Sequence, residues 1–495
     1  MNLKNILVGI EDLKGKGEFD IEISSIENDS RKVKKGSLFF AIKGFELDGN
    51  EYINSAIENG AIAIMVEKGT DIKSLKIKED IALIVAPNIR AAMAKCACNF
   101  YDDPTKKLKL IGITGTKGKT TTSFMIKEVL EKQGIKTGLI GTIANYIGDT
   151  YLGNSQRTTP ESIELQKLFS DMVDAGCGAA VMEVSSQSLK LHRVDGCEFY
   201  IGVFTNFSKD HISPNEHPDM EDYFNSKVKL FDMCRIGFVN ADDLYGDKLK
   251  RMEKDCEMTT YGINNFCNLL AKDITITNSY VDFKVKLVDR NERVKVSIPG
   301  RFSVYNSLAA IAVALRLGCS SENIKEALLD VRVPGRSELV TNKRELTIMI
   351  DYAHSPESLE NILSAVKTYT RGRVISVFGC GGDRDSSKRS IMGEISGRVA
   401  DYTIITSDNP RTEVPEKIVE QIEEGIKKTK GNYKAIVDRK EAIKEAIKIA
   451  NKTDIIVLAG KGHEPYQEIN GTKHNFDERL IVKEVIEELE KKSKK

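Results

Sequence analysis

A glycine-rich loop carries the clearest chemical pattern in the sequence. The loop TGTKGKT, residues 114–120, follows the apolar run LKLIGI and precedes a helical pattern. Glycines let backbone N–H groups turn toward phosphate oxygens, Lys119 can reach the β- and γ-phosphates, and the Thr120 hydroxyl can bind Mg²⁺. The strict phosphate-loop pattern requires glycine at position 113, where this chain has isoleucine. The loop predicts ATP or GTP binding, but it does not indicate which reaction uses the nucleotide. The alternative interpretation is a plain turn that caps a helix.

Three further side chains could complete such a site. Glu183 ends the apolar run GAAVMEV and is a candidate Mg²⁺ ligand, with helix capping as the alternative. His211 follows the next predicted strand and could bind a metal, although a lone loop histidine is more often a surface or packing residue. Lys227 lies in the amphipathic segment 221–231, where a solvated lysine is the ordinary interpretation.

Two polar loops stand out in the last third of the chain. They are GCGGDRD at 379–385 and DNPR at 408–411. Arginine suits bidentate capture of a carboxylate. Two arginines among several acids could therefore hold a zwitterion, such as an amino acid with an extra charged end. Salt bridges within the loops are the alternative interpretation.

The composition limits the classes of protein to consider. The chain has 495 residues, with 73 Lys+Arg and 73 Asp+Glu, so its formal net charge is zero. This balance disfavours binding to nucleic acid by broad phosphate neutralisation. We find neither an apolar run of membrane-spanning length nor a signal-peptide pattern. Nine cysteines without a CxxC pair indicate reduced thiols. We expect a cytoplasmic protein, by default a monomer, with no nucleic-acid or membrane partner.

Alternating short apolar runs and helical patterns predict an α/β protein of about three domains. We expect a small α/β domain at 1–105, a central domain with a mostly parallel sheet at 106–333, and a doubly wound domain at 334–495. The region 258–300 alternates like antiparallel strands. Strands are predicted at 36–42, 61–67, 81–87, 108–113, 137–142, 178–184, 200–206, 235–240, 346–352, 373–379, 402–407, 434–437 and 453–460. Helices are predicted at 51–60, 89–101, 121–133, 303–317, 356–369, 388–399, 415–428 and 439–450.

Nine motifs, spread in order over nearly the whole chain, resemble those of the Mur ligase family. They are TGTKGKTTT (114–122), MEVSS (182–186), TNFSKDH (205–211), GRFSVYNSLAA (300–310), VPGR (333–336), DYAHSPESLE (351–360), FGCGGDRD (378–385), SDNPR (407–411) and GKGHE (460–464). The resemblance implies an ATP- and Mg²⁺-dependent amide ligase of peptidoglycan precursor synthesis. It also implies an N-terminal domain for a UDP-sugar, a central P-loop ATPase-like domain and a C-terminal Rossmann-like domain for an amino acid.

Matching positions imply site residues, each a further expectation. The ATP site comprises Gly115, Thr116, Lys117, Gly118, Lys119, Thr120, Thr121, Asn306, Arg336 and Asp351. The UDP-sugar-peptide site comprises Ser30, Arg31, Thr158, Thr159, Ser185 and Arg193. The magnesium site comprises Thr120, Glu183 and His211, and Lys227 falls at the family's carboxylated lysine. The amino-acid site comprises Arg384, Asp408, Asn409, Pro410, Arg411, Gly460 and Glu464.

The DNPR loop resembles that of family members that add meso-diaminopimelate to UDP-N-acetylmuramoyl-L-alanyl-D-glutamate. Lysine-adding relatives lack the final arginine, since lysine has no second carboxylate to pair with Arg411. The chain departs from the family pattern at Gln187, Leu191 and 212–219, near the expected sugar-peptide contacts. The alternatives are the lysine-adding counterpart, another Mur or folylpolyglutamate-type ligase, a P-loop NTPase that switches or moves, and a nucleotide-sugar binding module.

Overall fold

The computed structural model describes residues 1–44, 47–72, 77, 80–155, 157–210, 212–213 and 216–493, and confirms the α/β expectation. The chain forms two compact units: Met1–Leu270 with Leu308–Ile324, and Ala271–Ser307 with Lys325–Lys495. The sequence-based domain boundaries stay a prediction. Every predicted strand and helix is present, with ends shifted by a few residues. Within the described ranges, no helix combines the length and hydropathy needed to cross a membrane.

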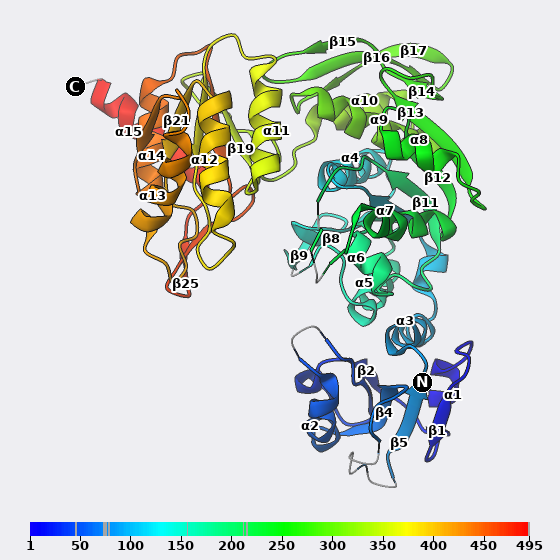
Figure 1. The fold of residues 1–495 in the computed structure, drawn as a ribbon. Coiled ribbons are helices and arrows are strands. Elements are labelled where there is room, and N and C mark those ends of the chain that lie inside the picture. Colours follow the sequence, from blue (N-terminus) through cyan, green and yellow to red (C-terminus); the bar gives the residue numbers. More distant parts are fainter. Residues whose placement is uncertain are drawn as a thin grey trace. The chain divides into compact units, whose positions relative to one another are not determined.

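A five-stranded sheet with helices on both faces forms the N-terminal part of the first unit (Figure 1). Successive residues of a strand point to opposite faces. Leu38 and Phe40 therefore pack in the cluster that contains α3, and Phe39 packs in the cluster that contains α2. The sheet order is β1(Lys14–Lys16), β5(Ala82–Ala86), β4(Ala61–Glu67), β3(Ser37–Phe40), β2(Ser25–Glu27), with only β1 antiparallel. The helices are α1(Leu3–Ile6), η1(Ser30–Lys32), η2(Gly49–Tyr52), α2(Ile53–Glu58), α3(Ile89–Phe100) and η3(Pro104–Lys107).

A nine-stranded sheet forms the centre of the first unit. Its order is β14(Leu269–Leu270), β13(Glu257–Gly262), β12(Cys234–Asn240), β11(Phe199–Phe204), β6(Lys109–Thr114), β10(Ala179–Glu183), β7(Thr137–Ile140), β8(Ala144–Ile147), β9(Thr150–Asn154). The strands from β14 to β7 are parallel, and β8 and β9 form an antiparallel edge. The chain order changes direction around β6, where ligands bind in open α/β sheets.

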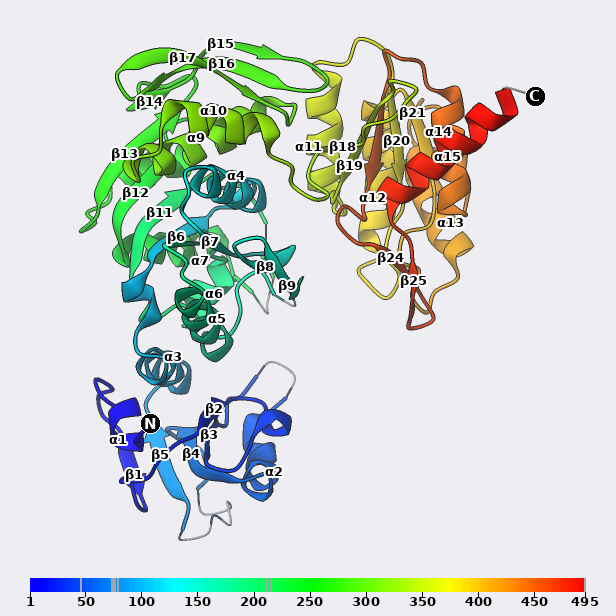
Figure 2. The same ribbon diagram turned by 180° about the vertical axis from the view of Figure 1, so that it is seen from behind.

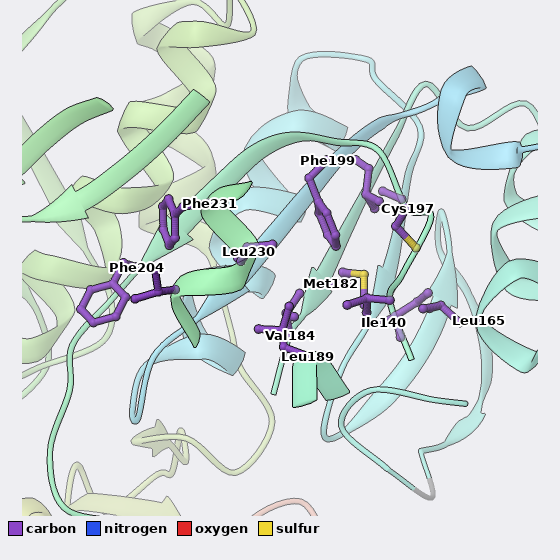
Figure 3. Packing of buried hydrophobic residues seen from close by; sticks show 14 of the residues in the cluster. Ile140, Leu165, Met182, Val184, Leu189, Cys197, Phe199, Phe204, Leu230 and Phe231 are labelled. Atoms are coloured by element: carbon purple, nitrogen blue, oxygen red, sulfur yellow. The ribbon is translucent and has the colours of Figure 1, made fainter. Parts of the chain in front are cut away.

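Buried aromatic and aliphatic side chains hold helices against this sheet (Figure 3). Met182 of β10 and Phe199 of β11 pack in one cluster with Leu165 of α5 and Phe231 of η4. This core fixes the strand ends that carry the polar loops. The helices of this region are α4(Lys119–Lys132), α5(Ser162–Asp174), α6(Ser186–Lys190), α7(Met220–Val228), η4(Lys229–Asp232) and α8(Leu244–Lys250).

The region predicted to be antiparallel forms a three-stranded sheet: β15(Lys272–Ile276), β16(Val281–Leu287) and β17(Arg290–Val296). Phe283, Val285 and Leu287 are buried and alternate with more exposed residues, as the period-two pattern requires. The helices α9(Arg301–Arg316) and α10(Ser321–Asp330) follow.

A six-stranded sheet carries the last third of the chain. Its order is β18(Glu338–Leu339), β19(Thr347–Asp351), β23(Ile455–Ala459), β20(Val374–Phe378), β21(Tyr402–Ile405), β22(Tyr433–Ala435), with only β18 antiparallel. One buried cluster contains α11(Pro356–Lys367), α12(Ser387–Val399) and α13(Pro415–Ile426). The other contains α14(Arg439–Ile449) and α15(Glu478–Ser493), which lie together in front of the sheet in Figure 2.

The sequence reasoning missed a hairpin, β24(Tyr466–Ile469) with β25(Thr472–Asn475). Asn470 and Gly471 form its turn with φ of +49° and +75°. Asn-Gly is a strong hairpin-turn pair, so the signal was present.

Candidate functional site

The glycine-rich loop lies at the carboxyl end of β6, between the ends of β11 and β10. Gly115 and Gly118 have φ of +144° and +85°, in the left-handed region that favours glycine. A Cβ atom on Gly115 would lie 2.0 Å from Oγ1 of Thr205. The loop therefore needs glycine at this position and runs directly into the N-terminus of α4.

Residues after β11 hold this loop in place. Oδ1 of Asn206 accepts a bond from the Lys117 N–H at 2.9 Å, and its Nδ2 donates to the Lys117 carbonyl at 2.9 Å. Oγ1 of Thr205 donates to the same carbonyl at 2.7 Å. The loop is thus fixed by the protein's own side chains, with Thr120 and Thr121 buried at the start of α4.

Two lysine ammonium groups converge on this loop. Nζ of Lys119 donates to the carbonyls of Gly115 and Thr116, each at 2.9 Å. Nζ of Lys227, on α7, donates to the same Gly115 carbonyl at 2.9 Å. Two lysine amino groups beside one carbonyl, one of them the charged Lys119, provide a position that suits an anionic ligand.

Lys227 is buried, with 1% of its surface exposed, so the ordinary interpretation as a solvated lysine was wrong. Burial, and secondly the charge of Lys119, hold the pKa of Lys227 well below its usual value, against an opposing effect of Asp210. A lysine with a lowered pKa is more often a neutral amine and hence a nucleophile. Carboxylation of Lys227 stays a prediction.

Glu183 lies at the end of β10 with 1% of its surface exposed. Oε2 accepts bonds from the Thr120 hydroxyl at 3.0 Å and the Thr142 hydroxyl at 3.1 Å, and Oε1 accepts from the Thr142 N–H at 2.8 Å. A carboxylate beside a hydroxyl at a phosphate loop fits Mg²⁺, which takes one or two protein oxygens together with phosphates and water. His211 lies outside the described residues, and within those residues no three His, Cys, Asp or Glu side chains form a metal-binding group.

A cavity of about 260 Å³ joins the loop lysines to the predicted sugar-peptide residues. Its lining is mostly cationic and hydroxylic: Lys119, Arg157, Thr158, Thr159, Ser185, Ser186, Gln187, Arg193, Glu216, His217 and Lys227. All four sugar-peptide residues predicted for this part of the chain are therefore present in one cavity.

Several of these cavity residues also support the local structure. Oγ1 of Thr159 donates to the Glu183 carbonyl at 2.9 Å, and Ser185 caps α6 by accepting from the Ser188 N–H at 3.1 Å. Nε of Arg193 lies 3.0 Å from Glu161. Burial lowers the pKa of Arg193.

Sequence reasoning missed His217, which is fully buried and lines the same cavity. Nδ1 contacts Oδ2 of Asp222 at 2.6 Å, and Nε2 contacts Oγ of Ser186 at 2.9 Å. The Asp222 carboxylate accepts a hydrogen bond from Nδ1–H, so the neutral ring has an unprotonated Nε2 that accepts from the Ser186 hydroxyl. Burial lowers the pKa of His217. His217, which lies where the sequence departs from the family pattern, therefore brings an imidazole to the cavity that Gln187 also lines. A single histidine in a predicted loop gave no sign of this.

Ser30 and Arg31 lie in η1 of the N-terminal part. Ser30 is buried, and its carbonyl accepts from Asn59 Nδ2 at 2.9 Å. Arg31 is exposed and donates to both carboxylate oxygens of Asp29, at 2.9 and 2.8 Å. Their role as uridine-side contacts stays a prediction.

The second unit holds the other predicted nucleotide residues. Asn306 is buried on α9. Oδ2 of Asp351 accepts from the Ser337 N–H at 2.8 Å, and the guanidinium of Arg336 lies 5.0 Å from the ring centre of Tyr352. Burial raises the pKa of Asp351, against the charge of Arg336.

Most of the residues predicted to bind the incoming amino acid lie together at the ends of β21 and β23. Nδ2 of Asn409 donates to Glu464 at 2.8 Å, and its Oδ1 accepts from Lys461 Nζ at 3.0 Å. Oδ2 of Asp408 is buried without a hydrogen bond within the described part of the chain, and a Cβ atom on Gly460 would lie 2.6 Å from it. Nη1 of Arg439 lies 4.0 Å from this oxygen. A buried carboxylate oxygen that accepts no hydrogen bond suits an incoming ammonium group. Lys461, which orients Asn409, was missed because one charged residue in a glycine loop gives no sign of burial.

Arg411 and Arg384 lie on neighbouring loops, the first half-buried and the second exposed. Nη1 of Arg411 donates to the Gly382 carbonyl at 2.6 Å, so the two polar loops touch. Sequence reasoning missed Arg389, which is buried and donates to both carboxylate oxygens of Glu413, each at 2.8 Å. This pairing holds the pKa of Glu413 down at about 2. Arg389 also donates to the Gly381 carbonyl at 3.2 Å and so fixes the loop that carries Arg384.

Family models match three successive regions of this chain, and curated relatives match nearly its whole length. The family models described as Mur ligase family, catalytic domain; Mur ligase middle domain; and Mur ligase, glutamate ligase domain match residues 22–101, 113–314 and 335–462. The UDP-N-acetylmuramoyl-L-alanyl-D-glutamate–2,6-diaminopimelate ligase of Caldanaerobacter subterraneus subsp. tengcongensis is 50% identical, covering 99% of this chain and 100% of the relative. The protein of that name from Clostridium tetani is 46% identical with the same coverage.

Solved structures agree with these matches. A structure of UDP-N-acetylmuramoyl-L-alanyl-D-glutamate–2,6-diaminopimelate ligase has a TM-score of 0.72 and 30% identity, covering 99% of each chain. A MurF ligase from Thermotoga maritima, solved with ADP, has a TM-score of 0.62 at 19% identity, covering 94% of this chain and 98% of that one, and so supports the fold alone. Three family models in order along the chain, together with a relative that is 50% identical over 99% of it, lead to one conclusion: the chain belongs to the Mur ligase family.

Proposed function

We propose that this protein is an ATP-dependent ligase that joins meso-2,6-diaminopimelate to the D-Glu γ-carboxylate of UDP-N-acetylmuramoyl-L-alanyl-D-glutamate. The observation that carries the proposal is the cavity that places Lys119 and Lys227 in one lining with Thr158, Ser185 and Arg193. A substrate carboxylate held there would lie next to the phosphate loop. The names of the full-length relatives support the same reaction.

The first step joins the carboxylate to phosphate. An oxygen of the γ-carboxylate attacks the γ-phosphorus of ATP, ADP leaves, and an acyl phosphate forms. Lys119 neutralises charge on the transferring phosphoryl group, and the backbone N–H groups of the loop orient the phosphates. Mg²⁺, held by Thr120 and Glu183 with His211 as a further proposed ligand, supplies additional positive charge when bound.

The second step forms the amide. The amine of the acceptor attacks the acyl carbon, inorganic phosphate leaves, and the amine loses a proton. Asp408, Asn409 and Glu464 hold the amino-acid end of the acceptor, with Arg384, Pro410 and Gly460 shaping its pocket. Arg411 takes its second carboxylate. His354, whose Nδ1 contacts the Tyr352 carbonyl at 2.8 Å, is a proposed acceptor for the amine proton.

The remaining roles follow the family positions. Ser30 and Arg31 contact the uridine side, and Asn306, Arg336 and Asp351 contact the nucleotide of ATP. The three functional segments are 1–105, 106–333 and 334–495. We also propose a cytoplasmic monomer, and the nine free cysteines support a reducing compartment.

Phosphate release tests the proposal. ATP and UDP-N-acetylmuramoyl-L-alanyl-D-glutamate are incubated with meso-diaminopimelate, with L-lysine, or with no acceptor. We expect release only with diaminopimelate, because lysine leaves Arg411 without a partner. Release only with lysine would indicate the lysine-adding counterpart. Release without any acceptor would indicate an NTPase.

A further inference from the structure

Arg411 already has an anionic partner in the fold, one that the family positions do not include. Oε2 of Glu468, on β24, lies 3.2 Å from Nε of Arg411. The two side chains keep 22% and 26% of their surface exposed, so both remain accessible from solvent. Arg411 makes its two side-chain hydrogen bonds through Nε and Nη1. A guanidinium has five N–H donors, so three remain for a ligand once its contacts with the described residues are counted.

The backbone clamps Glu468 beside the DNPR loop. The Glu468 N–H donates to Oδ1 of Asn409 at 3.0 Å, and the Arg411 N–H donates to the Glu468 carbonyl at 3.0 Å. The Asn470 N–H donates to the Arg411 carbonyl at 2.7 Å. These bonds hold Arg411 at φ +51°, a conformation that a non-glycine residue keeps only when its surroundings fix it. The backbone therefore holds the Glu468 carboxylate and the Arg411 guanidinium next to each other, an arrangement called the Arg411–Glu468 corner below.

The Arg411–Glu468 corner presents a cation and an anion to the distal end of the acceptor. The distal end of meso-diaminopimelate carries a carboxylate and an ammonium group on one carbon. The carboxylate matches the free donors of Arg411, and the ammonium matches the carboxylate of Glu468. L-Lysine offers only the ammonium.

We propose that Glu468 is a specificity-determining residue that binds the distal ammonium of the acceptor while Arg411 binds the distal carboxylate. This inference rests on the proposed function. When the acceptor binds, the two ion pairs with the ligand form in place of the direct Arg411–Glu468 contact. Each charge then keeps an opposite neighbour, so neither partner is left unpaired.

Three acceptors separate the two charges. meso-Diaminopimelate carries both distal groups, L-2-aminopimelate carries only the carboxylate, and L-lysine carries only the ammonium. Glu468→Gln keeps the shape and removes the charge. We expect it to raise the KM for meso-diaminopimelate about tenfold, the size of one charge-assisted hydrogen bond, with little change in kcat. For L-2-aminopimelate the KM should stay equal or fall. Arg411→Met should raise the KM for both dicarboxylates and increase any lysine turnover, because lysine then leaves no cation without a partner.

Glu484→Gln is the matched control, since Glu484 pairs with Lys440 on α14 and lies on α15. It should change none of the three KM values, and thermal melting of every variant checks folding. An equal rise in KM for diaminopimelate and aminopimelate in Glu468→Gln would overturn the inference, because Glu468 would then only support Arg411. No change for diaminopimelate would overturn it as well. If the wild type itself releases no phosphate with any acceptor, the proposed function fails instead.

Discussion

Replacing Lys119 with alanine is expected to lower kcat for acceptor-dependent phosphate release by about 10²–10³-fold, the cost of removing one preorganised donor to a developing charge. In the structure the Lys119 ammonium donates to the Gly115 and Thr116 carbonyls, so it already lies at the loop that would hold the phosphates. Steady-state kinetics with saturating ATP and both other substrates measures the effect.

Lys132→Ala is the control for this prediction, since Lys132 is the exposed last residue of the same helix. It should retain the wild-type kcat. Normal turnover in Lys119→Ala would refute the assignment of the loop. A loss of kcat together with a lowered melting temperature would call for Lys119→Gln, which keeps most of the side-chain packing.

Lys227→Arg is expected to lower kcat by about 10²-fold, because a guanidinium stays protonated and does not add CO₂. A neutral lysine amine attacks CO₂ to give a carbamate and a proton. The product is an anion beside the positive charge of Lys119, an attractive arrangement. A protonated Lys227 would instead be a second cation beside Lys119, a repulsive arrangement. The buried position of Lys227 and its lowered pKa both favour this reaction.

Two measurements check the modification. Wild-type activity should fall in CO₂-depleted buffer and return with bicarbonate, and ¹³C-bicarbonate should give a carbamate NMR signal that Lys227→Arg lacks. Lys229→Arg is the control, since Lys229 is exposed in the next turn and should behave as the wild type. Full activity of Lys227→Arg in either buffer would exclude a functional carbamate.

Local pattern was enough to predict the elements that carry the phosphate loop. An apolar run, a loop with two glycines and a helical pattern follow one another directly in sequence. No distant contact is therefore needed to recognise them. The same holds for the alternation of strands and helices after residue 346. Strand order and the pairing of β6 with β10 and β11 depend on contacts distant in sequence, which one chain's local pattern does not contain.

The environment of Lys227 shows where sequence reasoning fell short. Tyr223 and Phe224 are buried on α7, and Lys227 follows them by four and three residues, which places it on the same helical face. The spacing therefore indicated burial, but the charge of lysine favoured solvent. Lys227 is buried because its amino group donates to the Gly115 carbonyl, 112 residues away in sequence. This contact exists only in the folded chain.

His217 and Glu468 were missed for a related reason. Each is one polar residue in a segment without a strong period, and its importance comes from what lies opposite: Ser186 for one, Arg411 for the other. The Asn470–Gly471 turn predicts the hairpin that carries Glu468 but not the loop it packs against. Motifs located the site, and only the fold supplied its counter-charges.

Isotope transfer tests the central claim most directly. The D-Glu γ-carboxylate of UDP-N-acetylmuramoyl-L-alanyl-D-glutamate is labelled with ¹⁸O, and the phosphate released during turnover with ATP and meso-diaminopimelate is analysed by mass spectrometry. Attack of the carboxylate on ATP followed by amide formation leaves one labelled oxygen in each phosphate, which is the predicted result. Phosphate free of ¹⁸O would mean that water attacks ATP, and would contradict an acyl-phosphate ligase.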